Sequence, residues 1–323
     1  MGVDDTFVLD LFARGLHVGE MLLGGDEHES FLNWKVAIDA RVELGERPVW
    51  DEVSNTLVWV DINGGTIHRY SPQLGDEVLV DLGVSVGAVG LVRGGGYVAA
   101  TELGFIFVDT SGRVLADPIR PNDMGDDVRF NDGACDPCGR FFAGTTAKDS
   151  SPKLGSLYRL NTDLSITTVI DEVTESNGIG WSPDGSIMYY VDSGEPNAAI
   201  RSFVFDSASG NIGSETKLVS AHESWGVPDG LVVDVDGCLW VAFWGGAALR
   251  RFSPLGHLLE TYRVPVKYPT CPTFGGKDLT DLYVTTAWGD DDVLQRDANA
   301  GNVFLAVAPI AGRPAYRFGR PLR

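Results

Sequence analysis

The chain has 323 residues, of which 44% are hydrophobic and 40 are glycine, and its formal net charge is −20 at pH 7. Such an acidic surface attracts cations and argues against nucleic acid and anionic membranes as partners, because both bind basic patches. No run approaches 18 apolar residues, so no helix is expected to span a membrane. The first five residues are acidic where a signal peptide is basic, and the expected location is therefore cytoplasmic.

Residues 1–33 precede the repeated part of the chain and are predicted to be an N-terminal extension. Apolar side chains at helical spacing indicate a short amphipathic helix over residues 5–17. They are Phe7, Val8, Leu11, Phe12 and Leu16. A Gly-rich, acidic stretch at residues 24–29 is typical of a flexible tether. The sequence leaves open whether this extension is a docked helix or partly disordered.

A short apolar strand pattern recurs six times in residues 34–323, at intervals of 40 to 51 residues. The copies begin at Leu57, Tyr97, Phe141, Met188, Leu239 and Leu282. Several copies follow a turn signal, such as Asp-Pro-Cys-Gly at 136–139, and precede a second strand. Repeats of this length with several strands each predict propeller blades. We therefore expect an all-β fold, a six-bladed β-propeller in one domain, with a central channel.

Counting back 10 to 12 residues from each apolar strand reaches the predicted start of the innermost strand of that blade. The residues found there are Glu46, Gly87, Asn131, Asn177, Asp229 and Thr270. Equivalent positions in a propeller lie on one ring around the axis, so two carboxylates and two amides should meet at one mouth of the channel. The alternative is that these polar residues only cap strands and form hydrogen bonds within the channel.

Carboxylates confined together repel one another, and a divalent cation would neutralise them. Carboxylate and amide oxygens are hard donors, which favours Ca²⁺ and also suits Mg²⁺ or Mn²⁺. None of the five His residues falls on the ring, so a His-rich zinc site is not expected, although the same oxygens can accept Zn²⁺. The sequence thus predicts one divalent metal ion in the central channel.

Two other motifs are interpreted as structural. Cys135 and Cys138 form C-x-x-C, but no nearby His or second such pair completes a zinc set, so buried or turn cysteines are predicted. Residues 83–87 match G-x-S-x-G, the nucleophile elbow of serine hydrolases. That motif requires a strand-to-helix turn, whereas residues 88–92 are predicted to form a strand.

Four segments, residues 44–50, 129–133, 176–185 and 226–230, together resemble the signature segments of the regucalcin (senescence marker protein), gluconolactonase and luciferin-regenerating enzyme family. The resemblance covers about residues 40–310, and the family fold is a six-bladed β-propeller. It implies that Glu46, Asn177 and Asp229 are metal ligands and that Arg129, Asn131 and Asp149 bind substrate.

Two positions depart from the family pattern. Arg47 stands where Gly is common, and Asp149 stands where Glu is expected. We expect Arg47 to crowd the mouth of the channel or to bind an anionic substituent of the substrate. The shorter Asp149 would loosen a hydroxyl contact. Both departures concern the identity of the substrate more than the type of reaction.

The resemblance implies a divalent-metal-dependent lactonase that hydrolyses a sugar lactone to the sugar acid, with a small-molecule lactone as its binding partner. A bound cation would polarise the carbonyl, and Asp229 is the predicted general base. Arg129 and Asn131 would orient the sugar. The sequence leaves two alternatives open, a calcium-binding regulatory propeller with little catalysis and a hydrolase of a different lactone or ester. Oligomeric state is not predicted.

Overall fold

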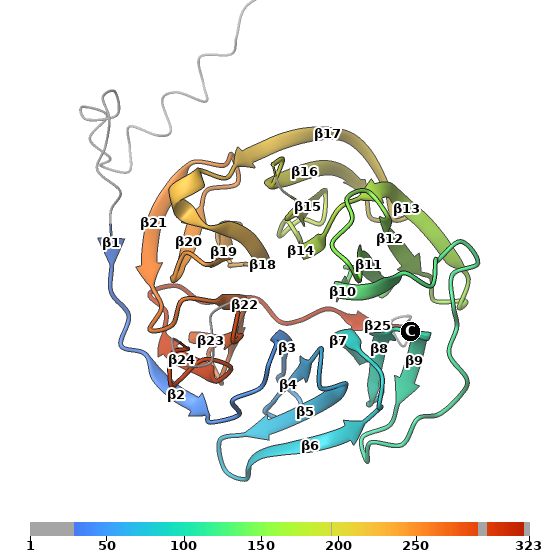
Figure 1. The fold of residues 1–323 in the computed structure, drawn as a ribbon, viewed down its shortest axis with the longest axis horizontal. Helices are drawn as coiled ribbons and strands as arrows, with labels where there is room; N and C mark the ends of the chain where they lie inside the picture. The colour runs from blue at the N-terminus through green and yellow to red at the C-terminus, as the bar shows by residue number, and fades with distance from the viewer. Residues whose placement is uncertain (1–28, 195, 290–295, 320–323) are drawn as a thin grey trace, which may run out of the picture.

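The computed structural model describes residues 29–194, 196–289 and 296–319, which form six small β-sheets arranged in a closed ring (Figure 1). The prediction of an all-β, six-bladed propeller is confirmed. Within the described ranges there is no α-helix, and one turn of 3-10 helix, η1 (Glu223–Trp225), is the only helical element. No helix in this part of the chain is long and apolar enough to cross a bilayer. The amphipathic helix predicted over residues 5–17 lies outside the described residues.

Each blade is an antiparallel sheet whose strands follow one another outward from the axis. The first three blades consist of β3 (Gly45–Asp51), β4 (Thr56–Asp61), β5 (Thr66–Ser71) and β6 (Gly75–Asp81); of β7 (Val86–Val92), β8 (Tyr97–Thr101) and β9 (Gly104–Val108); and of β10 (Val128–Cys135), β11 (Phe141–Ala147), β12 (Gly155–Leu160) and β13 (Ile166–Val173). The next three consist of β14 (Ser176–Trp181), β15 (Ile187–Asp192), β16 (Ala199–Asp206) and β17 (Asn211–Ser220); of β18 (Val227–Val233), β19 (Leu239–Trp244), β20 (Ala248–Phe252) and β21 (Leu258–Arg263); and of β22 (Pro269–Gly275), β23 (Asp281–Thr286) and β24 (Val303–Val307). The six repeated apolar segments are the second strands of these blades, and each predicted start lies within one residue of the observed one.

Segments from both ends of the described chain complete the ring. Strand β2 (Lys35–Ile38) is the outer strand of the sixth blade and pairs antiparallel with β24, Lys35 lying opposite Leu305. Strand β1 (Glu29–Ser30) adds to the fifth blade, parallel to β21. Strand β25 (Arg317–Phe318) pairs in parallel with β7 of the second blade. The last blade therefore combines strands from the beginning and the end of the propeller, which holds the ring closed.

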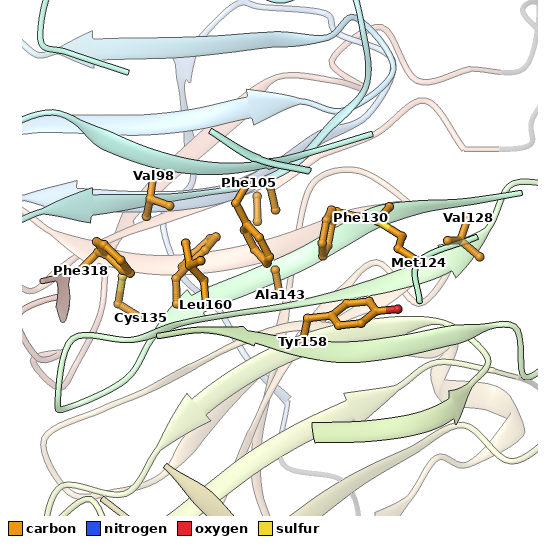
Figure 2. Packing of buried hydrophobic residues seen from close by; sticks show 13 residues of the cluster. Val98, Phe105, Met124, Val128, Phe130, Cys135, Ala143, Tyr158, Leu160 and Phe318 are labelled. Atoms are coloured by element: carbon orange, nitrogen blue, oxygen red, sulfur yellow. The ribbon is translucent and has the colours of Figure 1, made fainter. Parts of the chain in front are cut away.

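Apolar side chains pack between neighbouring blades. Figure 2 shows this packing where Phe105 of the second blade lies beside Phe130 and Ala143 of the third. The rings of Phe105 and Phe130 have centroids 4.9 Å apart. Phe318 of β25 joins the same cluster. Burying each such side chain contributes about 1.5–3 kcal/mol. The apolar residues of the repeated strands therefore hold neighbouring blades together.

A partly buried polar network connects the outer strands of the first blade. His68 lies between Thr66 and Asp76, with its Nε2 2.9 Å from Thr66 Oγ1 and its Nδ1 2.9 Å from Asp76 Oδ2. The indole N–H of Trp59 donates to the other oxygen of Asp76 at 3.0 Å, and the Trp59 and His68 rings stack with centroids 4.1 Å apart. These contacts join strands β4, β5 and the edge strand β6.

The C-terminal segment between β24 and β25 crosses the middle of the ring (Figure 1). Residues 313–316 of this segment line a small cavity of about 90 Å³ together with the later residues of the inner strands, such as Val49 and Trp181. The Arg313 guanidinium donates to the carbonyl oxygen of Pro183 at 3.1 Å. This end of the channel is therefore covered by the chain itself, and the larger opening lies at the other end.

Candidate active site

A cavity of about 590 Å³ opens where the inner strands begin. This volume lies in the range of typical small-molecule sites. Its lining brings together polar side chains from the first, third, fourth and fifth blades. They include Glu46, Arg129, Asn131, Glu175, Asn177 and Asp229. Five of these six were predicted from the sequence as site residues, although they lie as much as 183 residues apart in the chain.

The side chains on the ring are positioned by irregularities in the inner strands. In all six blades the register between the first and second strand shifts at or beside the ring position. The shifts lie between Glu46 and Val49, Val86 and Ala88, Phe130 and Asp132, Asn177 and Ile179, Pro228 and Leu231, and Pro269 and Pro272. A β-bulge bends the strand and redirects the side chain beside it. The same local distortion, repeated six times, shapes the floor of the cavity.

The remaining two ring positions have structural roles. A Cβ atom on Gly87 would lie 2.3 Å from the carbonyl oxygen of Phe130, so this glycine allows the second and third blades to approach closely. Thr270 is fully buried, and its hydroxyl donates to the carbonyl oxygen of Gly45 at 2.6 Å, which connects the sixth blade to the first. For Thr270 the alternative of hydrogen bonding within the channel describes the structure.

A chain of hydrogen bonds connects the third, fourth and fifth blades across the cavity floor. Arg129 Nη1 donates to Asn131 Oδ1 at 2.7 Å, and Asn131 Nδ2 donates to Asn177 Oδ1 at 3.1 Å. Asn177 Nδ2 in turn donates to Ser193 Oγ at 2.9 Å, and Ser193 donates to the carbonyl oxygen of Pro228 at 2.6 Å. Pro228 directly precedes Asp229. This chain orients both amides and leaves Asn177 Oδ1 with one lone pair for another partner.

The carboxyl groups of the cavity are held in an environment that disfavours their charge. Burial raises the pKa of Asp229 well above its usual value, and the charges of Glu46, Glu175 and Asp132 raise it further. Burial also raises the pKa of Glu46, again assisted by Asp132 and opposed by the backbone amide and guanidinium of Arg47. Groups that repel one another in a buried cavity call for a cation.

The donor set fits a hard divalent cation. Glu46, Asn177 and Asp229 are each at most 6% exposed and line the same cavity. Their oxygens are the type that Ca²⁺ and Mg²⁺ prefer. Within the described part of the chain no group of three His, Cys, Asp or Glu side chains is arranged to hold a metal ion, and the candidate set has two carboxylates and one amide. Three protein ligands of this kind would leave positions for water and substrate.

Comparison with known proteins identifies the family. Residues 44–288 match the SMP-30/Gluconolactonase/LRE-like region. The chain belongs to this family. It is 35% identical to zebrafish (Danio rerio) regucalcin over 295 residues, 90% of this chain and 99% of that protein. It is also 35% identical to YvrE of Bacillus subtilis, named as a candidate sugar lactone lactonase, over 277 residues that cover 85% of this chain and 94% of YvrE.

Solved structures agree with this assignment. A luciferin-regenerating enzyme superposes with a TM-score of 0.82 at 28% identity, covering 89% of this chain and 99% of its own. Regucalcin from Agrobacterium tumefaciens, described as a calcium-binding protein, superposes with a TM-score of 0.83 at 27% identity, covering 90% and 99%. The family resemblance seen in the four sequence segments is thereby confirmed.

Asp149, predicted from the family pattern to contact substrate, does not line the cavity. Its side chain is exposed on the turn after β11, where its carboxylate accepts a hydrogen bond from the backbone N–H of Ser151 at 3.0 Å. Its neighbours Ser150 and Pro152 do line the cavity. The short side chain of Asp favours this local turn contact, which a longer Glu would make less readily. In this structure the expectation that Asp149 reaches the substrate position is therefore not met.

Glu175 is a cavity residue that the family motifs did not indicate. It is half-buried, and burial raises its pKa while Arg129 opposes that shift. A signal was present in the sequence, because Glu175 precedes Asn177 by two positions, as Arg129 precedes Asn131. Side chains two positions apart on a strand share a face, so each pair points toward the same cavity.

Arg47 does not crowd the mouth as expected. Its side chain lines the small cavity at the covered end of the channel, and its Nε lies 3.7 Å from Asp132 Oδ1. The bulge that turns Glu46 toward the larger cavity sends the next side chain the other way. A role in binding an anionic substituent at the mouth is not supported by this placement.

The remaining motifs have the structural character predicted for them. Cys135 is buried, Cys138 is exposed, and neither is in a disulfide. The G-x-S-x-G segment connects β6 to β7, so a strand rather than a helix follows Ser85. A nucleophile elbow is not formed there.

Proposed function

We propose that the protein is a divalent-metal-dependent lactonase that adds water to a sugar lactone and releases the open-chain sugar acid. The observation that carries this proposal is the convergence of two buried carboxylates, an oriented amide and an Arg–Asn pair in one cavity of about 590 Å³. Family membership supports the same reaction, since relatives are named for gluconolactone and sugar lactone hydrolysis.

Glu46, Asn177 and Asp229 would hold the cation. When bound, a divalent ion polarises the lactone carbonyl and makes a bound water easier to deprotonate. Ca²⁺ is the proposed ion, because the donors are all oxygen atoms and a structurally similar relative is described as calcium-binding. Mg²⁺, Mn²⁺ and Zn²⁺ remain candidates for the same three ligands.

Arg129 and Asn131 would orient the sugar. The hydrogen bonds of Arg129 to Phe130 and Asn131 both use Nη1, and a guanidinium has five N–H donors in all. The other donors would bind sugar hydroxyls and stabilise the negative charge that develops on the carbonyl oxygen. Because Asn131 is fixed by Asn177 and by the carbonyl of Ser176, the pair is ordered before substrate arrives.

Asp229 would act as general base. Its carboxylate lines the same cavity as Glu46 and Asn177, so it would lie beside a water molecule held there. In the proposed reaction Asp229 accepts a proton from water while the water oxygen bonds to the lactone carbonyl carbon. The ring carbon–oxygen bond then breaks, and the leaving ring oxygen takes the proton back. One water is consumed, and the product is a hydroxy acid.

A second function is favoured by one observation, the names of the relatives. Several are regucalcins, and one solved structure is described as a calcium-binding protein. A calcium-binding regulatory propeller would need Glu46, Asn177 and Asp229 but would not need the Arg129–Asn131 pair. Their ordered arrangement in the cavity therefore favours the enzyme over this alternative.

The test is a pH-indicator hydrolysis assay on sugar, aromatic and fatty lactones. Chelated enzyme is measured with and without Ca²⁺, Mg²⁺, Mn²⁺ or Zn²⁺, after subtraction of spontaneous ring opening. Turnover that requires a metal and disappears in Asp229→Ala is the expected result. Metal binding without turnover on any lactone would instead support the binding propeller or an ester substrate of another kind.

A further inference from the structure

The cavity of the proposed active site has two chemically different sides. On the third and fourth blades the lining side chains are polar, and they include Arg129, Asn131, Thr174, Glu175, Asn177 and Ser193. On the fifth and first blades the lining includes a set of apolar side chains, namely Leu44, Ile62, Val227, Pro228 and Trp244. These two blades flank the sixth, which lies across the ring from the third (Figure 1). A ligand that fills the cavity therefore meets hydrogen-bonding groups on one side and hydrocarbon on the other.

The polar side chains that line the apolar side are already engaged. Asn63 Nδ2 donates to Glu43 Oε1 at 2.8 Å, and both residues are exposed at the edge of the cavity. Glu46 and Asp229 are proposed ligands of the cation. The contacts that this side offers to the rest of a substrate are therefore mainly apolar.

Trp244 is the largest apolar side chain on this side. It is half-buried at the end of β19, directly opposite Val227 at the start of β18. Opposed residues on antiparallel strands point to the same face of the sheet, so the two side chains form one surface. Apolar side chains that stay accessible within a cavity are typical of ligand contacts.

The indole of Trp244 is supported by a second aromatic ring. Tyr268 is 6% exposed and packs against Trp244 with ring centroids 4.7 Å apart. Gly289 leaves the room that Tyr268 occupies, because a Cβ atom on Gly289 would lie 2.2 Å from the Tyr268 ring. The φ of Gly289 is 69°, a conformation that also favours glycine. Trp244 is thus held in place before a ligand binds, which lowers the entropic cost of binding.

We infer that Trp244 determines substrate specificity and that the preferred substrate is a sugar lactone in which one hydroxyl carries an apolar group. The inference rests on the proposed lactonase function and deepens it, because it names the class of lactone. An unsubstituted sugar lactone has hydroxyls around its whole ring, and those on the apolar side would leave water without gaining partners. An apolar substituent placed there is instead removed from water against Trp244 and its neighbours, which is favourable.

The test compares two lactones that share one reacting ring, glucono-δ-lactone and its benzyl ether at the exocyclic hydroxyl. Hydrolysis by the full-length protein is followed with a pH indicator in Ca²⁺, after subtraction of the spontaneous opening of each lactone. The kcat/KM of the wild type should be at least about tenfold higher for the benzyl ether. Trp244→Ala should lower this ratio at least about fivefold, because the substituent loses its main contact. Trp244→Phe is the matched control, and because it keeps an aromatic ring its ratio should stay within about threefold of the wild-type value.

The outcomes separate this inference from the proposed function. Absence of metal-dependent turnover on these two lactones and on the wider panel above would overturn both. If lactones are hydrolysed but the benzyl ether is not preferred, the inference is wrong and the lactonase stands. A preference that Trp244→Ala leaves unchanged would remove the assigned role from Trp244. Thermal unfolding checks that each variant is folded; should Trp244→Ala not fold, Trp244→Gln is expected to lower the ratio in the same way, and the wild-type ratio still decides the substrate class.

Discussion

Ser193 makes a sharp test of how the cavity is held together. Its hydroxyl bridges two blades, since it accepts from Asn177 Nδ2 at 2.9 Å and donates to the carbonyl oxygen of Pro228 at 2.6 Å. The residue is only 4% exposed, so water does not readily replace these bonds. Ser193→Ala removes both bonds while keeping almost the same volume. It should loosen Asn177 and the segment that carries Asp229.

The expected loss of stability follows from these two bonds. Each buried bond contributes about 1 kcal/mol net, and an orphaned Asn177 donor adds a desolvation cost, for a total of about 2–3 kcal/mol. Unfolding entropy of about 2.1 cal/mol/K per residue amounts to about 0.6 kcal/mol/K for a domain of about 290 residues, so Tm should fall by about 3–5 °C. Because Asn177 Oδ1 loses its orientation, Ca²⁺ affinity should fall about 10–100-fold, which is the usual effect of removing a residue that hydrogen-bonds to a metal ligand.

The measurements are thermal unfolding in chelator and calorimetric titration with Ca²⁺. Ser220→Ala is the matched control, because Ser220 is exposed on β17 of the same blade and its loss should change stability by less than about 0.5 kcal/mol. If Ser193→Ala lowers Tm by less than about 1 °C and leaves Ca²⁺ affinity unchanged, the bridge does not position Asn177, and the reasoning from the hydrogen-bond chain is wrong.

Three further predictions concern the charges and the first blade. Asp229→Asn should abolish lactone hydrolysis. It should also raise the Tm of the chelated protein, because it removes one of several buried carboxylates that repel one another. A lower Tm would contradict this explanation. The folded-state pKa of Asp229 is raised, so its contribution to stability is present below its unfolded pKa near 3.8 and is lost as pH rises through the folded value. In chelator, the Tm advantage of Asp229→Asn over wild type should therefore grow from pH 5 to pH 8, whereas a constant difference would argue against a shifted group. Glu175→Gln should lower kcat/KM at least about tenfold and Ca²⁺ affinity by a smaller factor, because the charge of Glu175 acts on Arg129 as well as on Asp229. Equal loss of both would assign Glu175 to the metal instead. His68→Ala should destabilise the protein by about 2–3 kcal/mol in urea unfolding, because it removes two hydrogen bonds and the stacking on Trp59. The kcat/KM of this variant should be unchanged. A loss of activity without destabilisation would contradict a purely structural role for His68.

The repeat pattern was sufficient to predict the number of blades and to bring the polar ring residues to one cavity. Each blade has its own apolar second strand. The side chains of a strand alternate between its two faces, and this local pattern can be read directly from the sequence. Counting back from these strands therefore placed Glu46, Asn131, Asn177 and Asp229 on one ring from the sequence alone. Glu175 was also within reach, because its spacing from Asn177 repeats that of Arg129 from Asn131.

Other features depend on contacts between blades, and only the tertiary structure decided them. The irregularities at the ring positions arise from the pairing of two strands, and they sent Glu46 toward the open cavity and Arg47 toward the covered one. The turn that holds the Asp149 carboxylate on its own backbone removed that side chain from the site. The Ser193 bridge joins residues of different blades through single hydrogen bonds, which leave no periodic trace in the sequence. Local patterns thus determined the blades and the ring, whereas the direction and partners of each side chain followed from how the blades meet.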